Sequence, residues 1–231
     1  LGSWVAFERA SDGHVMAMGD LVLTESEVNP VVSALEQGGV EITAIHNHLY
    51  GTSPFTMYMH IRASGKDVDI ARAIRHGLEA SKTPLQAPPA SPPAPLGLDT
   101  IALAKAIGYS GKVNGGVFQV SVARNEHITE AGMDVPPSMG VATGINFQPT
   151  GGGKAAITGD FVMIGAEVNT VMRVLRSGGI SVTALHSHMI DENPRLYFMH
   201  FWANDDAIKL AHTLNAALVR TNSTKPKITD R

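Results

Sequence analysis

Hydrophobic residues recur at helical spacing in some segments and at strand spacing in others. The same order of segments occurs twice along the chain. Apolar residues spaced three and four apart predict amphipathic helices that begin near Val28 and near Val168. Both end at a glycine pair able to adopt the left-handed C′ conformation. The same spacing predicts helices over roughly residues 66–80 and 205–219, and the segment 99–108 also has a helical pattern.

Strands are predicted where apolar and polar residues alternate. The expected strands are residues 5–7, 15–23, 40–49, 55–63, 116–123, 142–147, 155–164, 180–189 and 195–203. Those on either side of Pro54 and Pro194 are expected to form hairpins. The pattern predicts an α+β fold of two tandem ββαββα repeats, with antiparallel sheets, helices on one face and a pseudo-twofold arrangement.

The start of the first long helix has two interpretations. Thr24 and Glu27 have the spacing of a capping box. Asn29 followed by Pro30 is typical of an N-cap with proline at the first helical position. Because proline is unfavourable inside a helix, we favour the second interpretation.

An internal duplication explains the repeated pattern. Residues 19–60 and 159–200 align without a gap at a separation of 140 positions, with 17 identities in 42 positions. Repeats of this kind indicate two copies of one structural unit.

The duplication suggests a division of the chain into repeats and connections. We expect a first repeat over residues 1–82, a proline-rich linker over 83–98, a second repeat with its leading helix and strand over 99–221, and a polar tail over 222–231. The linker contains the segment Pro84–Pro95, with six of the 13 prolines, which favours an extended spacer. Because nothing before Leu1 matches the segment that precedes the second copy, an N-terminal segment is expected to be missing.

Composition narrows the possible functions. The chain has 231 residues, 44% hydrophobic and 17% charged, as expected for a folded protein. The net charge is −3 and no basic stripe is present, so nucleic acid is not an expected partner. No apolar run approaches the roughly 18 residues of a membrane-spanning helix. The absence of cysteine excludes disulfides and thiolate chemistry, so histidine and carboxylate must supply any metal ligands.

Six of the ten histidines belong to the duplication. They are His46, His48 and His60 in the first copy, and His186, His188 and His200 in the second. Alternation along a strand places the first two of each set on one face. If the hairpin turns near residue 53, His60 lies opposite His46, so three imidazoles converge as in a catalytic three-histidine zinc site.

Two other interpretations of the histidines stay open. They can form a metal-free ligand pocket, or they can be structural. Zinc is the first choice among divalent metals, while copper, nickel and iron also bind imidazole. Tyr58 and Phe198 share the histidine face, whereas Met57 and Met59 are expected to pack beneath the helices.

Carboxylates supply the candidate general bases. Glu27 and Glu167 are equivalent positions, and Glu167 persists although Ile164 replaces Thr24. The alternative is that both carboxylates stabilise helix starts. Asp20 and Asp160 are candidates for hydrogen bonds to imidazole N–H groups, and turn formation is the alternative.

The motifs resemble a known bacterial family. The runs Gly19–Glu25, Glu27–Pro30, Thr43–His48 and Met57–His60 are similar to the LppY/LpqO-type domain of unknown function. The resemblance implies a tandem-repeated protein, export to the periplasm, cell envelope or medium, and a lipoprotein-like signal. It implies no activity.

The sequence therefore favours an exported metalloprotein with histidine-triad sites. It is expected to be a zinc-dependent hydrolase acting on a small or cell-envelope substrate, with Glu27 and Glu167 as bases. The alternative is a non-catalytic module that binds metal or a small ligand. A homo-oligomer is compatible with either.

Overall fold

The computed structural model describes residues 2–10, 13–86 and 96–225. Within them the fold is mixed α+β, with antiparallel sheets and five α-helices. The core of the expected linker and the end of the expected tail, 87–95 and 226–231, lie outside the described residues. No helix among the described residues combines the length and the hydropathy that crossing a bilayer requires.

The chain forms two compact units that are not continuous in sequence. Unit 1 comprises Leu1–Ala90, His127–Val141 and Ser187–Pro194, and unit 2 comprises Ser91–Glu126, Ala142–His186 and Arg195–Arg231. Two segments from the second half of the chain therefore belong to unit 1. The boundaries of the two repeats, the linker and the tail, which were expected from the duplication, stay predictions.

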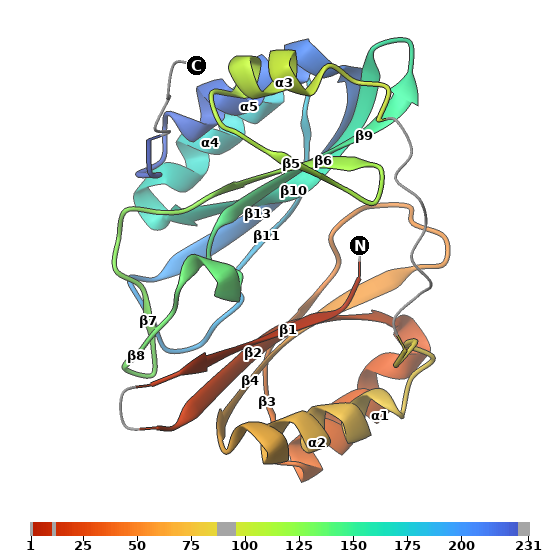
Figure 1. Ribbon diagram of the computed structural model, residues 1–231, viewed down its shortest axis with the longest axis vertical. Helices are drawn as coiled ribbons and strands as arrows, with labels where there is room; N and C mark the ends of the chain where they lie inside the picture. Colours follow the sequence, from red (N-terminus) through yellow and green to blue (C-terminus); the bar gives the residue numbers. More distant parts are fainter. Residues whose placement is uncertain (1, 11–12, 87–95, 226–231) are drawn as a thin grey trace. The chain divides into compact units, whose positions relative to one another are not determined.

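Unit 1 contains a four-stranded antiparallel sheet in the order β1-β2-β4-β3. Its elements are β1 (Trp4–Arg9), β2 (Val15–Thr24), the 3-10 turn η1 (Glu25–Glu27), α1 (Val28–Gln37), β3 (Glu41–His46), β4 (Thr56–Gly65) and α2 (Asp67–Leu78). Both helices cover one face of the sheet (Figure 1). Met59 and Ile61 pack beneath them, so the alternating His60 faces the other side.

Unit 1 also contains a small sheet in the order β12-β7-β8. These strands are β7 (Thr129–Glu130), β8 (Met133–Asp134) and β12 (Glu192–Asn193), and the turn η2 (Pro137–Met139) follows β8. The sequence pattern does not predict this sheet, because a two-residue strand shows no alternation.

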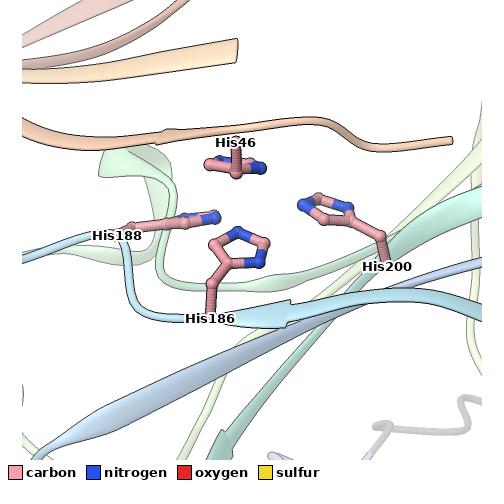
Figure 2. A group of neighbouring side chains, drawn as sticks. All are labelled: His46, His186, His188 and His200. Carbon is pink, nitrogen blue, oxygen red and sulfur yellow. The ribbon is translucent and has the colours of Figure 1, made fainter. Parts of the chain in front are cut away.

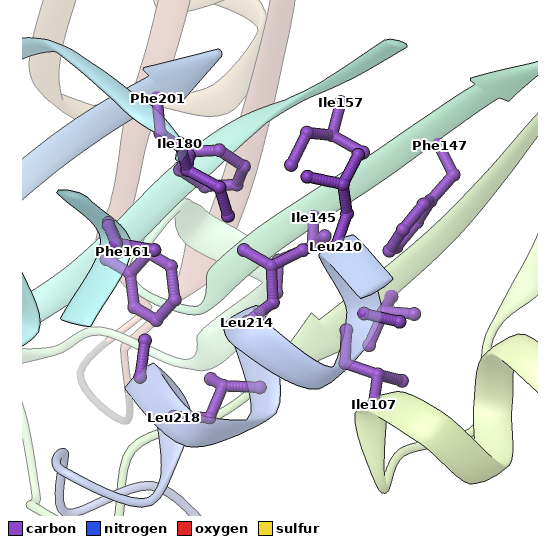
Figure 3. Close-up of a cluster of buried hydrophobic side chains, with 14 of the residues drawn as sticks. Ile107, Ile145, Phe147, Ile157, Phe161, Ile180, Phe201, Leu210, Leu214 and Leu218 are labelled. Carbon is purple, nitrogen blue, oxygen red and sulfur yellow. The ribbon is translucent and has the colours of Figure 1, made fainter. Parts of the chain in front are cut away.

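Unit 2 contains a six-stranded antiparallel sheet in the order β11-β13-β10-β9-β6-β5. Its elements are α3 (Thr100–Ile107), β5 (Lys112–Asn114), β6 (Val117–Val122), β9 (Thr143–Gly151), β10 (Lys154–Ile164), α4 (Gly165–Ser177), β11 (Ser181–His186), β13 (Leu196–Asp206) and α5 (Ala207–Leu218). The helices cover one face, and residues such as Phe161, Phe201 and Leu214 fill the core between the layers (Figure 3).

The favoured start of the first long helix is wrong. The helical segment begins after Thr24, and Pro30 lies inside the first turn of α1 rather than at its first position. Proline is tolerated there because the N–H groups of a first turn have no intrahelical acceptor. The backbone N–H of Thr24 instead donates to Glu27 Oε2 at 2.8 Å.

The expected histidine strands are too long. β3 ends at His46 and β11 ends at His186, so His48 and His188 lie beyond the strands. A register shift between Ile42 and Ala44 places Ala44, not His46, opposite His60. A bulge of this kind inserts one residue into the ladder and moves every later pair.

Candidate metal centre

The histidines of unit 1 remain on one face despite the shifted register. His46 pairs with Tyr58 across the β3–β4 ladder, and His60 pairs with Ala44 two residues earlier. Residues two apart on a strand point to the same side, so the rings of His46 and His60 are diagonal neighbours. Their centroids lie 5.0 Å apart.

Four imidazoles gather in unit 1. The ring of His46 lies 5.1 Å from that of His48 and 5.3 Å from that of His188, centroid to centroid. The rings of His60 and His188 stack at 3.6 Å, and His48 stacks on Tyr58 at 3.3 Å. His48, His60 and His188 are buried. Burial lowers the pKa of His46 to about 4, which keeps this imidazole in the neutral form that ligates metals.

A buried carboxylate lies beside these rings. Asp20 on β2 pairs with His60 on β4. Its Oδ2 lies 3.8 Å from His48 Nε2, and its Oδ1 lies 3.9 Å from His60 Nε2. Within the described residues Oδ1 is buried and accepts no hydrogen bond. Burial raises the pKa of Asp20 to about 7, because the charged form loses its hydration.

Unit 2 repeats part of this arrangement. His186 on β11 and His200 on β13 have ring centroids 5.0 Å apart. His200 Nδ1 donates to the Gly159 carbonyl oxygen at 3.1 Å and lies 3.9 Å from Asp160 Oδ1. An Nδ1–H bonded to a carbonyl fixes the tautomer in which Nε2 carries the lone pair that binds a metal.

Four histidines are candidate metal ligands by residue type and grouping, namely His46, His186, His188 and His200 (Figure 2). In unit 1 the ligand nitrogens of His46 and His188 lie within 4.8 Å of each other, and in unit 2 the same holds for His186 and His200. A histidine cluster of this kind can hold a metal ion, which confirms the expectation of a metal-compatible cluster. The assignment of one triad to each repeat stays a prediction.

Both candidate bases lie at helix starts. Glu27 accepts hydrogen bonds from the backbone N–H groups of Thr24 and Lys82, each at 2.8 Å. Glu167 accepts one from Ile164 N at 3.0 Å and is ion-paired with Arg124. The carboxylate half of a capping box needs no side chain at the N-cap, which explains why Glu167 persists opposite Ile164. A catalytic role for either residue stays a prediction.

The sequence left two features of this centre undecided. His188 is grouped with unit 1, although the duplication assigns it to the second copy. Asp20 lies nearest to His48 and His60, where the sequence left imidazole bonding and turn formation open. The available clue was that strand alternation puts Asp20 and His60 on the same face of one sheet.

Comparisons with known proteins assign a family and no activity. A family model described as "Domain of Unknown Function (DUF1259)" matches residues 1–80 and 101–220. No curated protein matches.

Solved structures with some similarity include two described as microcompartment shell proteins. EtuB from Clostridium kluyveri has a TM-score of 0.25 at 9% identity over 94% of this chain and 85% of its own. The trimeric shell protein MSM0271 has a TM-score of 0.25 at 11% identity over 94% and 93% of the two chains. The shell protein PduB has a TM-score of 0.23 at 10% identity over 96% and 97%. Similarity at this level establishes neither fold nor function.

Proposed function

We propose that this chain, which belongs to the DUF1259 family of domains of unknown function, binds a divalent transition metal ion through its repeated histidines. The observation that carries the proposal is the buried Asp20 carboxylate among the imidazoles of unit 1. Its Oδ1 accepts no hydrogen bond within the described residues, although it is fully shielded from water.

A buried oxygen without a donor is costly in a metal-free protein. Burying an unpaired polar group costs roughly 1–3 kcal/mol, and an ionised carboxylate costs more. A cation between Asp20 and the Nε2 atoms of His48 and His60 removes that cost. Zinc lies about 2.0–2.1 Å from its ligands, so two ligand atoms on one ion lie roughly 3.3 Å apart. The observed 3.8 and 3.9 Å separations need only a small contraction.

The donor set favours zinc among the divalent metals. Neutral imidazole and carboxylate are ordinary zinc ligands, and the chain has no cysteine to bind softer metals. Copper and nickel bind the same nitrogens, so they belong in the same titration. The family resemblance implies export, and export stays a proposal. A small-molecule or cell-envelope ligand is likewise a proposal.

Two uses of the metal follow from this donor set. A zinc ion with an open position supplies an activated water, which supports the hydrolase proposal. A closed site only sequesters the metal or presents it to a ligand. The helix-start contacts of Glu27 and Glu167 favour the binding module, because both carboxylates already have structural partners.

Metal content and metal titration test the proposal. Purified protein is analysed by mass spectrometry for bound metals, then stripped with chelator and titrated calorimetrically with Zn²⁺, Cu²⁺ and Ni²⁺. We expect Asp20→Asn and His48→Ala to weaken binding by at least about tenfold. His76→Ala is the matched control, because His76 is exposed on α2.

The metal-free stability of Asp20→Asn separates a metal role from a structural one. Removing a buried carboxylate charge is expected to leave the stripped protein as stable as the wild type or more so, while metal affinity falls. If none of the three metals binds or changes the melting temperature, the proposal is wrong. Metal binding without hydrolysis of model esters and amides would support the binding module.

A further inference from the structure

The cluster of imidazoles and carboxylate in unit 1 offers more ligand atoms than one metal ion uses. Its five side chains all belong to unit 1, namely Asp20, His46, His48, His60 and His188. A tetrahedral zinc ion takes four ligands, and a catalytic zinc ion takes three from the protein. Four ring nitrogens and two carboxylate oxygens exceed both numbers. The number of donors therefore suits two ions.

The distances between ring centres show which imidazoles can share an ion. A zinc–nitrogen bond of about 2.0–2.1 Å places the centre of a bound imidazole roughly 3.2 Å from the metal. Two such rings on one ion have centres about 5.2 Å apart at a tetrahedral angle and about 4.5 Å apart at a right angle. The ring of His46 lies 5.0 Å from that of His60 and 5.3 Å from that of His188. Either pair therefore fits a single ion.

The stacked pair of imidazoles does not fit a single ion. The ring centres of His60 and His188 are 3.6 Å apart, and the ring planes are inclined by 18°. This separation is shorter than either angle at one metal allows. The two ions of a two-metal site lie about 3.5–4 Å apart, which matches the spacing of the stacked rings. The stacking therefore suits one ring on each of two neighbouring ions.

The Asp20 carboxylate is placed to bridge such a pair of ions. Its Oδ2 lies 3.8 Å from His48 Nε2, and its Oδ1 lies 3.9 Å from His60 Nε2, so each oxygen lies beside a different imidazole. The buried Oδ1 accepts no hydrogen bond within the described residues. An ion bound only through Oδ2 would leave Oδ1 in that costly state. A bridging carboxylate gives each oxygen its own cation.

We propose that unit 1 binds two divalent transition metal ions bridged by Asp20. This inference rests on the metal-binding function proposed above and adds a second ion to it. One ion is held by Asp20 Oδ2, His48 and His188. The other is held by Asp20 Oδ1, His60 and His46. This assignment keeps the stacked rings on separate ions and gives each ion three protein ligands.

The number of bound ions tests the proposal in a chain without the histidines of unit 2. The variant His186→Ala/His200→Ala, called the unit 2 variant, is stripped with chelator, titrated calorimetrically with Cu²⁺ and weighed by native mass spectrometry. We expect it to bind two ions per chain. Adding His188→Ala leaves one ion, whereas adding His76→Ala, which alters an exposed histidine of α2, leaves two. Circular dichroism checks that each variant is folded.

Magnetic coupling between the ions tests the bridge. Two Cu²⁺ ions about 3.5–4 Å apart interact strongly, so their ordinary electron paramagnetic resonance signal is reduced and a half-field signal appears. We expect this coupled spectrum from the fully loaded unit 2 variant. Adding His188→Ala restores the ordinary spectrum of a single Cu²⁺ ion. The fully loaded wild type also gives the half-field signal, so the test does not depend on the folding of a variant.

The possible outcomes separate this proposal from the proposed function. One ion per chain in the folded unit 2 variant overturns the two-ion site and leaves metal binding in place. Two ions without magnetic coupling, or a loaded wild type without the half-field signal, overturn the bridge in the same way. A wild type that binds none of Zn²⁺, Cu²⁺ and Ni²⁺ overturns both.

Discussion

Replacing Arg124 by methionine is expected to destabilise unit 2 strongly. The guanidinium donates five hydrogen bonds, to the carboxylates of Glu126 and Glu167 and to the Val162 carbonyl oxygen, at 2.7–3.1 Å. The Glu126 and Glu167 side chains are 19% and 10% exposed. Methionine fills much of the same volume and supplies no donor, so it leaves two largely buried negative charges beside each other.

The size of the effect follows from this burial. Removing one partner of a buried ion pair costs about 3–5 kcal/mol, because the remaining charge loses its counterion and cannot regain full hydration. With a urea m-value of about 2 kcal/mol/M, the midpoint of unfolding falls by roughly 1.5–2.5 M.

Tryptophan fluorescence reports unit 2 selectively. The chain has two tryptophans, Trp4 in unit 1 and Trp202 in unit 2, so Trp202 is the only reporter in a Trp4→Phe background. Urea unfolding is compared for Arg124→Met and for Arg173→Met, an exposed arginine of α4. The exposed site should change stability by no more than about 0.5 kcal/mol. Equal midpoints for the two variants would refute the reasoning.

Two more predictions concern close packing and buried charge. Gly159→Ala should destabilise unit 2 by at least about 2 kcal/mol, because the added Cβ would lie 2.0 Å from the Gly144 carbonyl oxygen. Gly144→Ala is the control, because a Cβ added there has no other atom within 4 Å. Thermal unfolding should show that only the first variant is destabilised. Burial raises the pKa of Glu130, so the folded state binds its proton more tightly than the unfolded state, and stability falls as pH rises above the unfolded pKa. Between pH 4 and 7 the wild type should therefore lose stability relative to Glu130→Gln. Urea unfolding followed through Trp4 measures the free energy of unfolding of both proteins. A difference between the two free energies that does not change with pH would contradict this prediction.

The sequence predicted helices and strands correctly where the periodic hydrophobic pattern extended over many residues. The helices of each unit lie over the faces that their apolar residues predicted, and Met59 packs beneath them. Element ends were less predictable. The β3 strand stops at His46, and the shift between Ile42 and Ala44 changes every later pair in the ladder. A bulge leaves no mark in the hydrophobic pattern, because it inserts one residue without changing the residue types.

The candidate site was predictable as a set of residues and not as a geometry. Alternation put His46 and His60 on one face, and the structure keeps them there at a ring separation of 5.0 Å. The positions of His48 and His188 depend on loops that follow the strands, where periodicity gives no information. The proximity of Asp20 to His48 depends on the fold of that loop and on the pairing of β2 with β4.

The sequence by itself determined the duplication, the helix and strand types and the residues able to bind a metal, because these depend on residue identity and local periodicity. The tertiary structure alone decided which donors meet, since ring distances depend on register, bulges and loop paths between segments far apart in the chain. It also decided that Arg124 neutralises Glu167. Burial, which sets the energy of each charge, exists only once the chain has folded.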